Sequence, residues 1–146
     1  MNPRRLSTLF ILALLPAFAT AQGLERTSAP EDARVYFITP DDGAALTSPV
    51  TVRFGLEGMG VAPAGIDQNR TGHHHLLIDV DESNMPAMDM PLPTTDHVVH
   101  FGGGQTEVSI DLAPGEHTLQ LLLGDHRHVP HDPAVMSEKI TITVEE

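Results

Sequence analysis

The chain has 146 residues and a formal net charge of −12 at pH 7, with 9 histidines and no cysteine. This length suits one domain, and the acidic balance argues against nucleic-acid binding because such a surface repels phosphates. The lack of cysteine excludes disulfides, thiolate catalysis and cysteine-ligated zinc or iron–sulfur sites. Stability must therefore come from a packed core, with or without a bound metal.

The chain begins with the pattern of an export signal. A positively charged start precedes an apolar stretch over residues 6–18, and Ala19–Ala21 fits a small-residue cleavage site. The apolar run is too short to span a bilayer as a helix, and no later segment approaches that length. We therefore expect a periplasmic or secreted protein whose mature chain starts at Gln22, with a flexible polar leader over residues 22–33 and one domain over residues 34–146.

The domain alternates short β-type runs with glycine, proline and aspartate turns, and no helical period persists. The apolar alternation predicts seven strands, over residues 34–39, 50–56, 73–80, 98–101, 106–112, 117–123 and 140–144. Seven short strands in about 110 residues indicate an all-β fold, an antiparallel immunoglobulin-like β-sandwich. A small closed barrel is the structural alternative.

Most of the histidines fall in two short tracts, residues 73–75 and residues 125–131. In an immunoglobulin-like sandwich the third and sixth strands are antiparallel neighbours, so the start of one and the end of the other meet at one pole. His100, near the end of the fourth strand, is expected at the same pole. His117 opens the sixth strand at the opposite pole, and the place of His97 stays open.

Imidazole is the commonest metal ligand among side chains, so this concentration of histidine predicts a metal site. His73 and His75 are two residues apart on a strand and share one side, which leaves His74 on the side of the core. Together the two tracts offer three or four nitrogens, enough for copper(II) or zinc. The predicted ligands are His73, His75, His100, His126, His128 and His131. The alternative is that these imidazoles bond loop carbonyls at a crowded, proline-rich pole.

Several other side chains could assist such a site. Asp79 or Asp125 could orient an imidazole by accepting its second N–H, although aspartates are also common turn residues. His74 fits a core position or the base of the site. Thioethers favour copper(I), and three of them occur close together, at Met85, Met88 and Met90. The same methionines could instead form a flexible apolar lid.

Four segments resemble a family of small exported bacterial proteins known only as domain of unknown function 4399. They are residues 58–65 (GMGVAPAG), 71–79 (TGHHHLLID), 100–107 (HFGGGQTE) and most of residues 114–140. The resemblance implies an exported domain and carries no activity. The three methionines stand where we expect acidic and proline residues in the family, so a role for them would be particular to this protein.

No catalytic motif is recognisable: a nucleophile elbow, a cysteine nucleophile and a His-Glu-x-x-His helix are all missing from the sequence. We therefore expect a non-enzymatic protein that binds copper, or zinc, and carries or buffers it in the cell envelope. An envelope protein is a conceivable partner for the exchange. The alternative function is a metal-independent interaction module that binds a protein or polymer, with histidines as hydrogen-bonding or pH-sensing groups.

Overall fold

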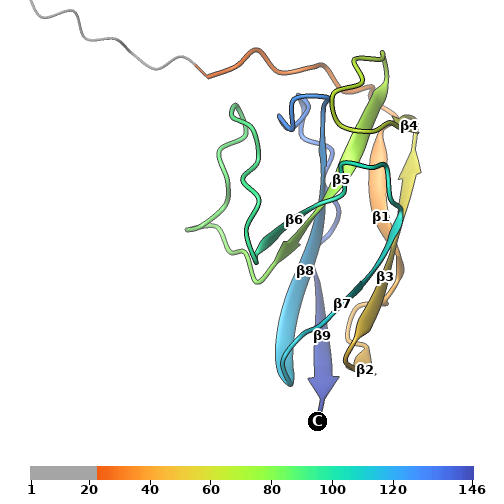
Figure 1. Cartoon of the computed structure of the whole chain (residues 1–146), viewed down its shortest axis with the longest axis vertical. Helices are drawn as coiled ribbons and strands as arrows, with labels where there is room; N and C mark the ends of the chain where they lie inside the picture. The colour runs from red at the N-terminus through yellow and green to blue at the C-terminus, as the bar shows by residue number, and fades with distance from the viewer. Residues whose placement is uncertain (1–22) are drawn as a thin grey trace, which may run out of the picture.

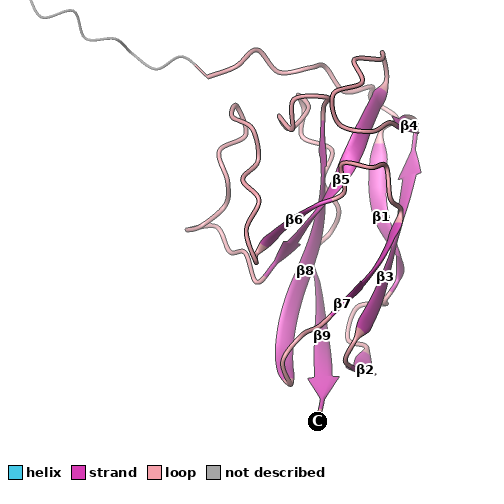
Figure 2. Ribbon diagram, viewed as in Figure 1, coloured by secondary structure: helices cyan, strands magenta, loops and turns pink. Residues whose placement is uncertain are grey.

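The computed structural model describes residues 23–146, and every regular element in that range is a β-strand. The fold is therefore all-β, as Figure 2 shows. The strands are β1 (Arg34–Thr39), β2 (Ala45–Thr47), β3 (Val50–Glu57), β4 (Gly60–Val61), β5 (Thr71–Ile78), β6 (Val98–His100), β7 (Glu107–Ile110), β8 (Gly115–Gly124) and β9 (Ile140–Glu145). All seven predicted strands are present, and β2 and β4 are additional. The export signal predicted over residues 1–21 lies outside the described residues.

The strands form two sheets that stand face to face (Figure 1). One sheet has the order β1-β3-β7, and the other has the order β2-β9-β8-β5-β4, with β6 also paired to β5. The expectation of a purely antiparallel fold is wrong in two places, because β2 pairs with β9 and β4 pairs with β5 in parallel. In both cases a strand of two or three residues lies at the edge of a mixed sheet.

The main core lies between the two sheets. On β3, Val50, Val52 and Phe54 are buried while Thr51 and Arg53 between them are exposed, as expected for a strand with one face on the core. From the opposite sheet, Leu76 and Leu121 belong to the same buried cluster. No helix long and apolar enough to cross a membrane occurs in residues 23–146.

The six-stranded sheet is unusual because its outer face is also covered. All residues of β5 from Gly72 to Ile78 are buried, which explains why its sequence does not alternate polar and apolar residues. On the outer face lies a second apolar cluster, formed by Leu77, Val80, Leu92, Val98 and Leu122. The loop that joins β5 to β6, residues 79–97, stands out to the left of this face in Figure 1 and covers it. We call this segment the cover loop.

The segment that precedes β1 lies against the loop that follows β8. Ala29 N–H donates to the Asp132 carbonyl at 2.9 Å, and Asp132 N–H donates to the Thr27 carbonyl at the same distance. The Arg127 guanidinium donates to the Glu25 carbonyl at 2.7 Å. The polar segment that we predicted as a leader is thus hydrogen-bonded to the second histidine tract.

Candidate metal centre

The pairing of three strands and one loop brings four histidines together. His73 pairs with Gly124 and His75 with Leu122 where β5 and β8 run antiparallel, and His75 also pairs with His100 on β6. His128 comes from the loop after β8. Because side chains alternate along a strand, His73 and His75 both point to the outer face of the sheet, beside the apolar cluster under the cover loop.

The four imidazoles of His73, His75, His100 and His128 form one compact group. One ring nitrogen from each lies within 4.8 Å of those of the other three. The ring centres of His100 and His128 are 4.3 Å apart, and the widest pair, His75 and His128, is at 5.9 Å. His73 Nε2 lies 3.0 Å from His128 Nδ1. A four-coordinate ion with metal–nitrogen bonds near 2.05 Å needs nitrogens about 3.3 Å apart. To bind such an ion, the ring nitrogens would have to approach one another by no more than about 1.5 Å.

The buried nitrogens of this group lack hydrogen-bond partners within the described part of the chain. His73 Nδ1, both nitrogens of His75 and His100 Nε2 are buried and unpaired. Buried polar atoms are almost always hydrogen-bonded, because a lost bond to water costs free energy. Each neutral imidazole has one nitrogen with a lone pair and one N–H, so a metal ion that accepts one lone pair from each ring would satisfy part of this set.

Burial keeps the imidazoles in the neutral form that binds metals. Desolvation, together with the nearby charges of His128 and His100, lowers the pKa of His73 to about 4. Burial and the charges of the neighbouring histidines lower the pKa of His75 to about 3. Burial also lowers the pKa of His100, with a further contribution from His128. At neutral pH these rings carry a free lone pair without having to release a proton.

Two glycines make room for the rings, and neither was identified as a site residue from sequence. A Cβ on Gly124 would lie 2.7 Å from Cε1 of His75, and a Cβ on Gly102 would lie 2.5 Å from Nε2 of His100. Such distances are far below van der Waals contact, so any side chain at either position would displace a ring. Gly124 is the last residue of β8 and follows directly after the strand predicted over residues 117–123, where a glycine reads as an ordinary turn residue, so the sequence did not indicate this close approach.

The remaining predicted ligands lie outside the group of four. His126 lies 3.6 Å from the carboxylate of Asp67, as an ion pair when protonated. His131 is fully buried, and its Cε1 is 3.0 Å from where a Cβ on Gly72 would be. Because Gly72 shares a strand face with His74, His131 lies toward the inner side of the sheet, away from the four imidazoles.

The predicted auxiliary residues are also divided. His74 points into the main core, as its position on the strand predicted, and its ring packs against Phe54 with centres 5.1 Å apart. Asp79 lies at the far end of β5, where it accepts a hydrogen bond from His117 Nδ1 at 2.8 Å. Asp125 is buried in the loop that carries His128 and accepts the backbone N–H of Arg127 and of Val129.

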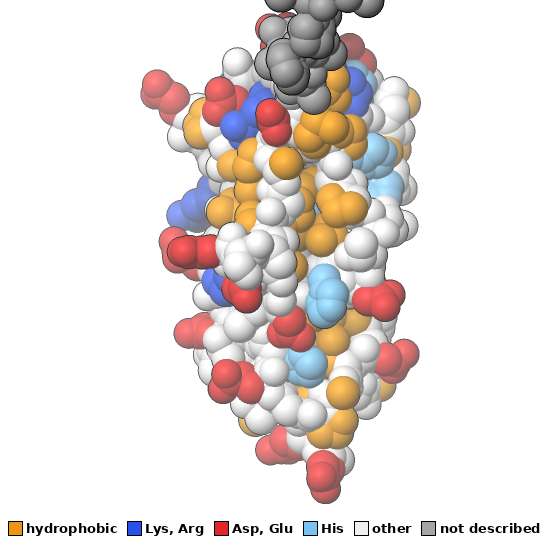
Figure 3. All heavy atoms as spheres, turned by 90° about the vertical axis from the view of Figure 1, so that its left-hand side faces the viewer, with side chains coloured by type: hydrophobic (Ala, Val, Ile, Leu, Met, Phe, Trp, Pro, Cys, Tyr) orange, Lys and Arg blue, Asp and Glu red, His pale blue; other side chains and the backbone are white. Residues whose placement is uncertain are grey.

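The methionines lie on the cover loop. Met85 and Met88 are half-buried against the outer apolar cluster, whose members Leu77 and Leu122 adjoin His75 along β5 and across the ladder. Met90 is 49% exposed. The cover loop is tied to the site, since Leu92 N–H donates to the carbonyl of His128 at 2.9 Å. Figure 3 views the side of the molecule that faces left in Figure 1 and shows apolar and histidine side chains reaching the surface there.

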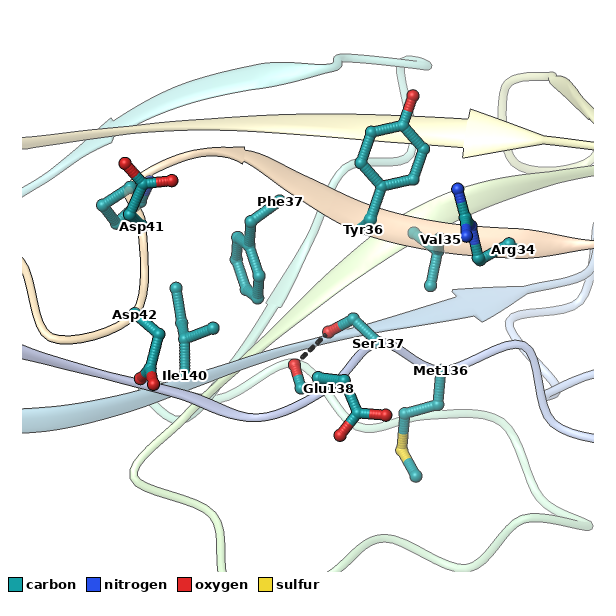
Figure 4. Close-up of a pocket in the computed structure, with 11 residues that line it drawn as sticks. Arg34, Val35, Tyr36, Phe37, Asp41, Asp42, Met136, Ser137, Glu138 and Ile140 are labelled. Carbon is teal, nitrogen blue, oxygen red and sulfur yellow. Dashed lines mark hydrogen bonds between the residues drawn. The ribbon is translucent and has the colours of Figure 1, made fainter.

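A cleft elsewhere in the molecule is separate from the four histidines. It has a volume of about 590 Å³ and lies between β1 and the segment that enters β9. Figure 4 shows Tyr36, Phe37 and Met136 among its lining residues. The lining includes no histidine, so this cleft is not part of the candidate metal centre.

Comparisons with known proteins place the chain in a family without giving it an activity. Residues 52–145 match the family described as a domain of unknown function, DUF4399. No curated protein and no solved structure matches the chain.

Proposed function

The chain belongs to the DUF4399 family, whose function is unknown, so its role must be inferred from the site itself. We propose that the protein binds one transition-metal ion, copper in preference to zinc, through His73, His75, His100 and His128. The observation that carries this proposal is the group of four imidazoles on the outer face of the six-stranded sheet, with ring nitrogens within 4.8 Å of one another and with buried, unpaired nitrogens on three of the rings.

The ligand set favours copper or zinc over other metals. Four imidazoles offer nitrogen only, whereas magnesium and calcium prefer oxygen ligands. Among divalent first-row ions, nitrogen sites bind copper most tightly, which places copper(II) ahead of zinc. The four imidazoles would fill all four positions of a tetrahedral ion, whereas catalytic zinc sites usually keep one position open. Binding, carriage or buffering of the metal therefore fits the site better than catalysis.

The wider setting of this role rests on the sequence. The signal-like start supports a periplasmic or secreted protein, where copper and zinc would need a carrier. Of the four histidines, His100 and His128 are only partly buried, and His128 lies in a loop, which would permit exchange with an envelope partner. An immunoglobulin-like sandwich remains our proposed fold class, with the two parallel edge pairs as departures from that topology.

The methionines support copper because thioethers bind copper(I) and have little affinity for zinc. Changing Met85, Met88 and Met90 together to leucine should weaken copper(I) binding by about tenfold and leave zinc binding unchanged. The measurement is competition against a chromophoric chelator for each metal. Equal affinities in the variant and the parent would show that the methionines only pack on the apolar cluster.

The direct test of the proposed function is metal titration of the mature chain purified without a histidine tag. We expect one copper(II) or zinc ion per chain with a dissociation constant below about 1 μM, lost in the double variant His73→Ala/His128→Ala. The matched control is His97→Ala/His117→Ala, which removes two histidines far from the site and should leave the affinity unchanged. Only weak binding at several sites would reject a metal centre and favour a metal-independent partner.

A further inference from the structure

A buried carboxylate lies behind the loop that brings His128 to the site. Asp125 is 1% exposed and is the only fully buried acid among residues 23–146. Its Oδ1 accepts the backbone N–H of Arg127 at 2.8 Å and of Val129 at 3.0 Å. Its Oδ2 accepts the hydroxyl of Thr27 at 2.8 Å.

These bonds fix a turn that His128 could not hold by itself. The backbone of Asp125 and His128 closes the turn, with His128 N–H donating to the Asp125 carbonyl at 2.9 Å. His128 has a φ of 67°, in the left-handed region that side chains other than glycine rarely adopt. A conformation of that kind persists only where surrounding contacts enforce it. The carboxylate of Asp125 supplies such contacts on both sides of His128.

The same carboxylate supplies negative charge in the segment that joins Gly124, the partner of His73, to His128. Burial alone would raise the pKa of Asp125, but the hydrogen bonds from Thr27, Arg127 and Val129 lower it below its ordinary value. The carboxylate is therefore ionised at neutral pH, and Asp125 directly follows Gly124, which pairs with His73 across the β5–β8 ladder. Arg127 reaches Asp125 at 3.3 Å, but its side chain is 41% exposed, so water screens its positive charge.

We infer that Asp125 is the positioning and charge-balancing residue of the metal centre. It holds the turn that presents His128, and it places one negative charge next in the chain to Gly124, the partner of His73. An ion bound by four imidazoles keeps its full charge, so a nearby anion stabilises a divalent ion about twice as much as a monovalent one. Asp125 would thus favour copper(II) over copper(I). This inference rests on the proposed function, because it concerns the same four-histidine site.

The test is Asp125→Asn, which keeps the size of the side chain and removes its charge. We expect copper(II) affinity to fall by about 100-fold and copper(I) affinity by about tenfold. That tenfold difference corresponds to a rise in the copper reduction potential of about 59 mV. The matched control is Asp79→Asn, since Asp79 also accepts a backbone N–H, from Thr118, but lies at the other end of β5. Its affinities and potential should equal those of the parent.

Equal losses for copper(II) and copper(I), or no loss for either, would overturn the inference. If Asp125→Asn does not fold, as circular dichroism of the metal-free protein would show, Thr27→Val decides the positioning role. That change removes one hydrogen bond to the carboxylate and should lower the affinities for copper(II) and copper(I) by the same few-fold factor. Unchanged affinities would reject the positioning role. Failure of the proposed function looks different, because the parent protein would then bind no copper at all.

Discussion

Histidines at the two ends of the β5–β8 ladder have opposite environments. At one end, His73, His75, His100 and His128 pack against each other, and the first three have buried nitrogens without hydrogen-bond partners. At the other end, His117 Nδ1 lies 2.8 Å from Asp79, and its Nε2 lies 2.9 Å from the carbonyl of Ala113. Nearby, His97 Nδ1 lies 2.9 Å from the carbonyl of Ile78.

The contrast shows that hydrogen bonding, more than the number of histidines, marks the candidate metal centre. Burial lowers the pKa of His73, His75 and His100, whereas the pKa of His117 is raised because its hydrogen bonds to Asp79 and Ala113 outweigh burial. Oxygen atoms already satisfy the ring of His117, and a structural role accounts for it fully. The four grouped rings have no such partners and so require another ligand.

The largest expected effect of this contrast is on how the free energy of unfolding of the metal-free protein depends on pH. The pKa values of His73 and His74 are about 4 and that of His75 is about 3, all below the ordinary 6.5, mainly because of burial. Between those values and 6.5 the unfolded chain binds more protons than the folded one. Stability should therefore be complete above about pH 6.5 and fall on acidification, by on the order of 5 kcal/mol down to pH 4.5.

Urea unfolding at a series of pH values measures this loss. The control is His97→Gln, which should show the same fall because His97 lies at the other end of β5, where its Nδ1 lies 2.9 Å from the carbonyl of Ile78. A stability that stays level between pH 6.5 and pH 4.5 would mean that the grouped histidines are not buried as neutral rings.

The next largest effect concerns Gly102, whose missing side chain leaves space for the ring of His100. Gly102→Ala would place a methyl group 2.5 Å from Nε2 of His100 and so displace that ligand. We expect the dissociation constant for zinc to rise by between about tenfold and 100-fold, as when other supporting residues of metal sites are changed.

Gly103→Ala is the matched control for this change. A Cβ there would meet only the side chain of Gln105, at 3.1 Å, and Gln105 is exposed and can move. Its zinc affinity should equal that of the parent. If both variants bind zinc equally, His100 is not a ligand.

A smaller effect should separate His74 from its neighbour His75. Neither nitrogen of His74 has a hydrogen-bond partner in the described structure, and the ring lies in the core beside Phe54. His74→Leu should therefore stabilise the metal-free protein by about 1 kcal/mol, because it removes unsatisfied polar atoms. Metal affinity should stay unchanged in this variant, whereas His75→Leu should lose it. Isothermal titration and thermal unfolding of both variants check the pair, and a loss of metal binding in His74→Leu would contradict the account.

The smallest effect belongs to the far end of the ladder. His117 has a raised pKa through its bonds to Asp79 and Ala113, so its contribution to stability is present below pH 6.5 and is lost as the pH rises through the folded-state value. Because Asp79 is 37% exposed, the contribution should be below about 1 kcal/mol. His117→Gln should thus be less stable than the parent at pH 5.5 and nearly equal to it at pH 8.5. An unchanged difference between the two pH values would show that the pair is not ionic.

Much of the fold follows from the local pattern of the sequence. Runs such as residues 50–56 alternate apolar and polar residues, and the structure has strands at all seven predicted places. The pattern could not reveal β2 or β4, because strands of three and two residues carry too few side chains to show a period. Their parallel pairing, β2 with β9 and β4 with β5, depends on which longer strand the fold brings beside each of them, and the local sequence does not contain that information.

The part of the site that lies on strands could be predicted from the sequence. The alternation along β5 predicts that His73 and His75 share a face, and strand pairing brings His100 beside them. The loop after β8 has no fixed period, so the sequence could not separate His128 from His126 and His131. The bonds that Asp125 makes, and the left-handed backbone at His128, determine which of these three rings reaches the outer face.

The most direct test of the account is a count of the ligands around the bound metal. X-ray absorption spectroscopy of the zinc-loaded mature protein, at one ion per chain, distinguishes imidazole nitrogen from oxygen and sulfur. The account predicts four imidazoles at about 2.0 Å. Two or fewer imidazoles, with the rest of the shell made of oxygen, would contradict a centre built from His73, His75, His100 and His128.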